Sequence, residues 1–274
     1  MQQKELYDVI IVGASIEGIA LAEYLLTNKP ELKIAIVSRS FKYLAQKAGA
    51  LNIDELTGEV VLSTYYHGVI GFTLKDRRAV YGKKAVIATG TKPIKPFIND
   101  PKLKNSGMVY SPADIINISK NHQVVVAGSS ADAVKYSIEL AKRFKYVYLC
   151  SKEFNLDCDT KLLKKLNDLP NVVHLPGCNI VSYKKDRNGR IQEVTLDTYS
   201  TIHCAALVGA FGRLPDISGV SPKMLEVDLD GYAVVTNKNE STKIPGIYVI
   251  SACARRNTKH MLTVVGDAIL GGKE

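Results

Sequence analysis

A short turn near the N-terminus has the residue types of a phosphate-binding loop. It reads Gly13-Ala14-Ser15-Ile16-Glu17-Gly18 and follows the apolar run YDVIIVG. The spacing matches the dinucleotide fingerprint G-x-G-x-x-G, with Ser15 in place of the middle glycine. Gly13 permits a tight turn, Ser15 is small enough for a pyrophosphate to approach, and Gly18 lets the next helix pack closely on its strand. The helix N-terminus then offers free N–H groups to the phosphates.

A second turn of the same kind occurs about 115 residues downstream, at Gly128-Ser129-Ser130-Ala131-Asp132-Ala133. Ser130 takes the middle position and Ala133 the third, where alanine is tolerated. Asp132 suits the helix dipole but opposes a bound pyrophosphate. One such turn is weak evidence, because any close strand-to-helix crossover needs small residues, whereas two copies favour two dinucleotide-type domains.

The elements around the two turns follow one pattern. A buried strand over 7–13, a helix over 16–28 and a strand over 32–37 form a βαβ unit. Residues 123–128, 131–144 and 146–150 repeat that order. The fold class predicted is therefore α/β, with two Rossmann-like dinucleotide-binding domains.

Outside the two βαβ units, some segments have a clear secondary-structure pattern and others do not. Residues 41–60 are ambiguous, and 91–107 reads as a linker because it holds three of the ten prolines. We expect an antiparallel meander, three further buried strands and a closing helix. Their ranges are 60–65, 69–74 and 77–81 for the meander, 84–88, 203–209 and 246–251 for the strands, and 262–270 for the helix.

Composition narrows the class of protein. Of the 274 residues 46% are hydrophobic and 23% charged, which is typical of a globular chain and excludes a disordered or collagen-like one. The first residues have no apolar core of a signal peptide, and no run reaches about 20 apolar residues, so we expect a cytoplasmic protein without a membrane span. The net charge of +9 favours anionic partners, but it does not distinguish nucleotides or phosphates from nucleic acid or an anionic membrane.

Other chemistries find little support. The five histidines are scattered without metal-ligand spacing, so no metal site is expected. The lysines are dispersed and no nucleic-acid motif occurs, which disfavours a nucleic-acid partner. The five cysteines include no C-x-x-C pair, and each is interpreted as a packed thiol.

With these motifs the chain resembles a two-dinucleotide-binding-domain flavoprotein, of the low-molecular-weight thioredoxin reductase branch of the pyridine nucleotide–disulfide oxidoreductases. The resemblance covers essentially the whole chain. It rests on both glycine turns and on the following segments in order: Ala88-Thr89-Gly90-Thr91-Lys92-Pro93, Gly212-Arg213-Leu214-Pro215-Asp216, Gly231-Tyr232-Ala233-Val234-Val235 and Pro245-Gly246-Ile247-Tyr248.

The resemblance implies a discontinuous FAD-type domain, residues 1–111 and 214–274, with an NAD(P)H-type domain, 112–213, inserted in it. It also implies a homodimer and hydride transfer from NAD(P)H to FAD, with no catalytic residue of the protein's own. Cofactor-binding positions carried over for FAD are Gly13, Ser15, Ile16, Gly18, Ser38, Arg39, Ala88, Thr89, Gly90, Ser251, Ala252 and Thr263. Those for NAD or NADP are Gly128, Ser129, Ser130, Ala131 and Lys152.

Four departures from the family pattern stand beside these matches. Ser38, followed by Arg39, replaces the acidic residue that holds a ribose hydroxyl pair. Ser251 and Ala252 replace the late Gly-Asp pair, whose carboxylate meets the FAD ribityl and phosphate region. The C-x-x-C motif of the dithiol relay is absent, and the strand over 146–150 ends in neither an acidic residue nor an arginine pair, so NAD versus NADP stays open.

Two functions follow from this pattern. The first is an FAD- and NAD(P)H-dependent oxidoreductase that works without a redox-active dithiol on an unknown acceptor. The alternative is a non-catalytic descendant that binds a nucleotide or a partner protein without FAD, which the three replaced anchors favour.

Overall fold

The protein is described by a computed structural model, which covers residues 6–41, 52–94, 108–115, 118–198, 200–254 and 261–271. The chain forms two compact units. The first combines Met1–Lys92 with Leu214–Glu274, and the second is Pro93–Arg213. Both are α/β, which confirms the fold class of two Rossmann-like domains.

The first unit is built on a seven-stranded mixed sheet with the order β3-β2-β1-β6-β5-β4, and β17 also pairs with β6. The strands next to β1 run parallel to it, while β4, β5 and β6 pair antiparallel. The central strands are buried on both faces, as expected for parallel strands. Their bounds are β1 Leu6–Val12, β2 Ile34–Ser38, β3 Ile53–Thr57, β4 Val60–Tyr66, β5 Val69–Leu74, β6 Ala79–Ile87 and β17 Ile247–Val249.

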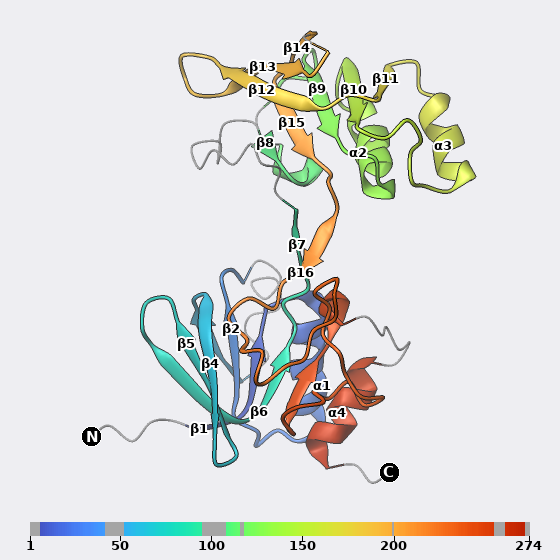
Figure 1. Cartoon of the computed structure of the whole chain (residues 1–274). Helices are drawn as coiled ribbons and strands as arrows, with labels where there is room; N and C mark the ends of the chain where they lie inside the picture. The colour runs from blue at the N-terminus through green and yellow to red at the C-terminus, as the bar shows by residue number, and fades with distance from the viewer. Residues whose placement is uncertain are drawn as a thin grey trace. The chain divides into compact units, whose positions relative to one another are not determined.

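Two layers cover this sheet (Figure 1). Helices α1 (Ile16–Asn28) and α4 (Met261–Leu270) pack on one face and bury an apolar cluster that includes Leu21, Leu25 and Val265. On the other face, side chains of the central strands share an apolar cluster with β4, with β5, which carries Phe72, and with the segment before β17, which carries Met224. Because β1 pairs parallel with both β2 and β6, the carboxyl ends of these three strands lie at one edge of the sheet.

The second unit repeats the arrangement with a five-stranded parallel sheet, order β11-β10-β9-β15-β8. Helices α2 and α3 cover one face, and the small antiparallel sheet β12-β13-β14 covers the other (Figure 1). The bounds are β8 Met108–Val109, β9 Gln123–Ala127, α2 Ala131–Ala141, β10 Tyr146–Ser151, α3 Thr160–Asn167, β11 Val172–Pro176, β12 Ile180–Lys185, β13 Ile191–Leu196, β14 Thr201–His203 and β15 Ala206–Gly209.

Short elements complete the chain. Strands β7 (Thr91–Pro93) and β16 (Arg213–Pro215) form a two-stranded sheet. Two 3₁₀ helices, η3 (Pro112–Asp114) and η4 (Ser251–Cys253), interrupt the loops. In the part of the chain that the structure describes, no helix is both long and apolar enough to span a bilayer.

Several predicted elements differ in the structure. The predicted strands 77–81 and 84–88 form one strand, β6, because β1 pairs with it continuously from Tyr81 to Ile87. The predicted strand 203–209 is wrong as a single element. The Cys204 N–H donates to Gln192 at 3.0 Å, whereas the next N–H, of Ala205, donates to Gln123 of the other sheet at 2.9 Å.

The stretches predicted as ambiguous and as linker also contain strands. Strand β3 lies within 41–60 and pairs parallel with β2. The linker 91–107 holds β7, while its residues 95–107 lie outside the described residues. The first segment of the first unit extends to Lys92, whereas the sequence predicted it to reach residue 111, and β8 pairs with β15 in the second unit's sheet.

Candidate functional site

The first glycine turn leaves no room for a side chain at its start. Gly13 has φ +112°, and a methyl group built there would lie 2.4 Å from the Ala88 carbonyl oxygen. The turn is held between two strands, since the Gly13 N–H donates to Val37 and the Ala88 N–H to Val12, both at 2.8 Å. The bare backbone at this point is what a closely bound pyrophosphate requires.

Helix α1 begins directly after this turn. Ser15 is its N-cap and accepts a hydrogen bond of 3.1 Å from the Gly18 N–H. A side chain at Gly18 would lie 2.5 Å from the Gly13 carbonyl oxygen, so only glycine allows the helix to approach the turn this closely. Ile16, at the first helical position, is exposed.

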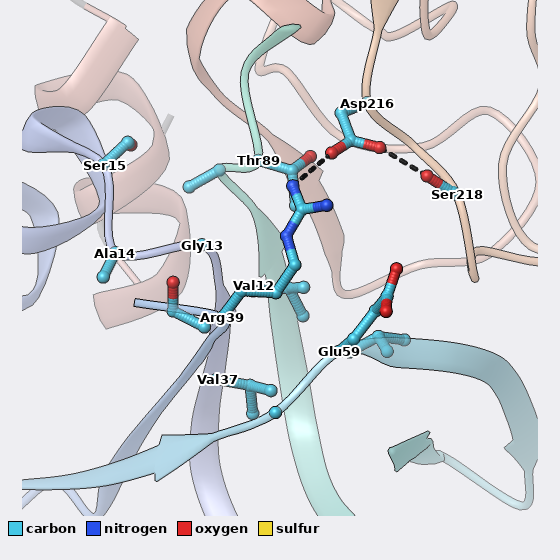
Figure 2. Close-up of a pocket in the computed structure, with 14 residues that line it drawn as sticks. Val12, Gly13, Ala14, Ser15, Val37, Arg39, Glu59, Thr89, Asp216 and Ser218 are labelled. Atoms are coloured by element: carbon cyan, nitrogen blue, oxygen red, sulfur yellow. Dashed lines mark hydrogen bonds and ion pairs between the residues drawn. The ribbon is translucent and has the colours of Figure 1, made fainter. Parts of the chain in front are cut away.

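A pocket of about 210 Å³ opens at the carboxyl ends of β1, β2 and β6 (Figure 2). Open parallel sheets bind ligands at this edge. The pocket is lined by six of the residues predicted for FAD: Gly13, Ser15, Ser38, Arg39, Ala88 and Thr89. The other lining residues are Val12, Ala14, Val37, Gly58, Glu59, Val60, Asp216 and Ser218.

A charged network crosses one side of the pocket. Figure 2 shows Arg39 reaching from the end of β2 to Asp216, with Nη2 2.8 Å from Oδ2. Lys92 Nζ lies 3.4 Å from Asp216 Oδ1, and the Ser218 hydroxyl also donates to that carboxylate. Burial alone would raise the pKa of the Asp216 carboxyl, but Ser218 and the charges of Lys92 and Arg39 hold it below its ordinary value. Asp216 is therefore an anion, and it holds the guanidinium of Arg39, whose side chain is 63% exposed, at the rim of the pocket.

Ser38 ends β2 and lines the pocket, at the position predicted to meet an adenosine ribose. Its hydroxyl donates to the Ser40 carbonyl at 2.9 Å. The oxygen can still accept one hydrogen bond, whereas a carboxylate would accept from both hydroxyls of a ribose. The end of β2 is thus a weak anchor for an adenosine ribose.

The replaced Gly-Asp pair forms a corner beside the pocket. Ser251 has φ +69°, a conformation that favours glycine, and its hydroxyl would lie 3.7 Å from a methyl group built at Gly90. Thr89 Oγ1 lies 4.0 Å from Cys253 Sγ in the same corner. Ala252 is exposed there and supplies no polar atom beyond its backbone. Six residues predicted for FAD do not line the pocket: Ile16, Gly18, Gly90, Ser251, Ala252 and Thr263. Thr263 is exposed in the first turn of α4.

Some lining residues were missed from the sequence. Gly58 and Glu59 follow β3, which the ambiguous pattern of 41–60 concealed. Asp216 stood in a recognised motif, Gly212-Arg213-Leu214-Pro215-Asp216, without a role assigned to it. The signal available for Asp216 was an acidic residue directly after the short strand β16.

The second glycine turn has the same geometry. Gly128 has φ +147°, and a methyl group there would lie 2.1 Å from the Ala210 carbonyl oxygen. The Ser130 hydroxyl donates to that same carbonyl at 3.2 Å, so it does not cap helix α2, which begins at Ala131. The first amides of α2 therefore lack a side-chain cap, and this backbone fits the phosphates of a dinucleotide.

The segment after β10 folds back onto this turn. The Asp157 N–H donates to the Ser129 carbonyl at 2.8 Å, and the Glu153 N–H lies 3.4 Å from the Ser129 hydroxyl, which accepts its hydrogen bond. Lys152, predicted to supply a positive charge, is exposed in this segment. The structure thus brings Ser129 and Ser130 together with the residues that follow the second strand of the unit.

A buried serine at the end of β10 is hydrogen-bonded to a histidine of β11. The Ser151 hydroxyl donates to the Glu153 carbonyl and lies 2.8 Å from His174 Nε2. Because the single hydroxyl proton is already donated, His174 must carry its proton on Nε2 and donate it to Ser151. Burial lowers the pKa of His174.

Acid is expected to destabilise the protein through His174. With its pKa lowered in the folded state, the unfolded chain takes up the proton first as the pH falls below about 6.5, so this contribution is present at neutral pH and is lost below that value. Urea unfolding at about pH 7.5 and about pH 5.5 measures the loss. His174→Gln should show a smaller loss than the unchanged protein. His122→Gln, at an exposed histidine of the same unit, is the control. Equal losses in all three proteins would contradict the assignment.

The cysteines lie in the cores of the units. All five are free thiols, and all but the half-buried Cys158 are buried. Burial raises the pKa of the Cys150 thiol well above its usual range and that of Cys204 to about 12. Because the thiolate is the reactive form, these thiols are poor nucleophiles. No group of three or more potential metal ligands occurs among the described residues.

Comparison with known proteins agrees with this geometry. Residues 38–268 match the family described as "Pyridine nucleotide-disulphide oxidoreductase". Thioredoxin reductase of Ureaplasma parvum is 22% identical over 97% of this chain and 95% of its own, and ferredoxin–NADP reductase of Orientia tsutsugamushi is 24% identical over 87% and 73%. The crystal structure of T. acidophilum thioredoxin reductase superposes with a TM-score of 0.78 at 18% identity, covering 98% of each chain, which shows a shared fold. The chain belongs to the pyridine nucleotide–disulphide oxidoreductase family, as a thioredoxin reductase-like member.

Proposed function

We propose that the protein is an FAD-dependent NAD(P)H oxidoreductase that works without a redox-active dithiol. The observation that carries the proposal is the pair of glycine turns, each of which starts with a glycine that has no room for a side chain and leads from the carboxyl end of a parallel strand into a helix. The first turn lines the pocket and is the position for FAD, while the second is the position for the nicotinamide dinucleotide.

Residues of the first unit would bind and orient the flavin cofactor. The Gly13–Ser15 backbone would meet the pyrophosphate, and Ser38 and Arg39 would meet the adenosine end. Asp216, held as an anion by Lys92 and Ser218, keeps Arg39 at the pocket rather than in open solvent. The chemistry that bound FAD supplies would be two-electron transfer, taken as a hydride from NAD(P)H and passed to an acceptor.

The acceptor would be a small molecule, a quinone-like compound or a protein redox carrier. The absence of C-x-x-C from the sequence and the burial of Cys150, Cys178, Cys204 and Cys253 support a route that bypasses protein thiols. A relative named for ferredoxin and NADP supports a protein carrier as one such acceptor. A cytoplasmic location and a homodimer stay predictions of the family resemblance.

A non-catalytic nucleotide-binding or partner-binding protein is the second candidate. The observations that favour it are the missing carboxylates at Ser38 and Ala252 and the left-handed backbone of Ser251, where the family has glycine. Each lost anchor to a buried polar cofactor weakens binding by about 1–3 kcal/mol.

An absorption spectrum of the purified protein, before and after denaturation, tests the proposal. We expect a flavin band close to one flavin per chain and its bleaching by a reduced nicotinamide dinucleotide without oxygen. Colourless protein that also fails to take up added FAD would refute the oxidoreductase and favour the second candidate, which calorimetric titration with nucleotides then examines.

A further inference from the structure

The segment after β10 lies where the second unit would meet the adenosine ribose of a dinucleotide. Two of its N–H groups, those of Glu153 and Asp157, are hydrogen-bonded to Ser129 of the glycine turn. Asp157 also forms a parallel bridge with Ser130. In Rossmann units the residues that follow the second strand decide whether the ribose is unmodified or carries a 2′-phosphate.

This segment is acidic. Residues 151–159 carry three carboxylates, Glu153, Asp157 and Asp159, against one cation, Lys152. The sequence has no arginine between Arg143 and Arg187. Asp159 is engaged as the N-cap of α3, and a further carboxylate, Asp132 in the first turn of α2, is paired with Lys135 at 3.6 Å. Within the segment, a 2′-phosphate would therefore meet more carboxylates than cations and would find no guanidinium fork, which binds phosphate through two parallel hydrogen bonds.

The last residue of the strand cannot bind the ribose itself. Ser151 is fully buried, and its hydroxyl is already bonded to the Glu153 carbonyl and to His174. The first side chains free to face a ligand are the exposed Lys152 and Glu153. A carboxylate accepts hydrogen bonds from both hydroxyls of an unmodified ribose, whereas a single lysine beside a carboxylate is a weak site for a phosphate.

We propose that the second unit selects NAD(H) over NADP(H), with Glu153 as the residue that holds the 2′- and 3′-hydroxyls of the adenine ribose. The inference rests on the proposed function only in so far as a nicotinamide dinucleotide occupies this turn. It does not depend on whether FAD is bound.

Calorimetric titration of the whole protein with NAD⁺ and with NADP⁺ tests the proposal, because the oxidised forms bind without turnover. We expect NAD⁺ to bind more tightly by about tenfold, the scale of one charge-assisted hydrogen-bonding site. Glu153→Gln should remove most of that preference, and Glu153→Arg should reverse it. Glu139→Arg makes the same change of charge at an exposed position of α2 two turns beyond its start, and should leave the ratio unchanged.

The outcomes separate this inference from the proposed function. A flavin that NADPH bleaches as well as NADH, with equal binding of NAD⁺ and NADP⁺, would overturn the inference and leave the oxidoreductase standing. Colourless protein that fails to take up added FAD but still prefers NAD⁺ would refute the oxidoreductase and support the inference. Binding of neither dinucleotide, or a ratio that responds to Arg39→Ala in the first unit and not to Glu153→Gln, would overturn the inference.

Discussion

Replacing Gly13 by alanine is expected to abolish FAD binding and to lower the free energy of unfolding by about 2–5 kcal/mol. The added methyl group would lie 2.4 Å from the Ala88 carbonyl oxygen and 2.9 Å from the Thr89 nitrogen, both backbone atoms that cannot rotate away. The left-handed backbone, with φ +112°, adds strain of its own. Urea unfolding and the ratio of flavin to protein measure the two effects.

Gly68→Ala is the matched control for this variant. Gly68 also has a positive φ, +80°, but no atom lies within 4 Å of a methyl group built there. It should cost only the conformational strain, about 1–2 kcal/mol, and should retain the flavin. If Gly13→Ala kept its flavin and were no less stable than Gly68→Ala, the close approach of the turn to Ala88 would not matter for binding.

Restoring the missing carboxylates is expected to strengthen flavin binding. Ser38→Glu should add an acceptor for both ribose hydroxyls, because the single Ser38 oxygen already accepts from the Ser40 N–H and has only one lone pair left. One well-placed charged hydrogen-bonding group contributes about 1.5–3 kcal/mol, which is about a 10- to 100-fold gain in affinity. Ser38→Gln, nearly equal in size and uncharged, is the control and should give much less. FAD titration of flavin-free protein measures the affinity.

The second carboxylate requires a change of backbone as well as of side chain. Ser251 sits at φ +69°, so Ser251→Gly should relieve about 1 kcal/mol of strain, and Ala252→Asp should then supply the family's second anchor. Because Ser38 lies on β2 and Ala252 in η4, the gains of the two sites should add. Flavin affinity unchanged in the combined variant would contradict the assignment of these two positions as FAD anchors.

Local requirements explain why the glycine turns could be predicted. A residue that must adopt positive φ under a neighbouring carbonyl leaves its mark on the sequence as glycine, as at Gly13 and Gly128. Apolar strands before the turns and periodic helices after them are equally local, and both βαβ units occur where the sequence predicted them. The resemblance to the family that the comparison found rested on both glycine turns together with the later motif segments, such as Gly212–Asp216.

Contacts between distant residues explain what could not be predicted. Arg39 is paired with Asp216, 177 positions away, and that pairing converts a basic residue beside the ribose position into part of a charged network. Strand β3 has few buried positions, so only its pairing with β2 identifies it. Strand β8 is only two residues long, and its parallel pairing with β15 is what identifies it as a strand of the second unit's sheet.

The amino-acid sequence by itself determined the two Rossmann-like units and the positions of their glycine turns, because backbone conformation and strand burial restrict the residue types locally. It also determined the loss of carboxylates and of C-x-x-C, which are matters of composition. Only the tertiary structure decided which groups remain available to a ligand. The Ser151 hydroxyl is hydrogen-bonded to His174 and Glu153, and the Ser38 hydroxyl to Ser40. These partners depend on how the strands and loops pack around each hydroxyl.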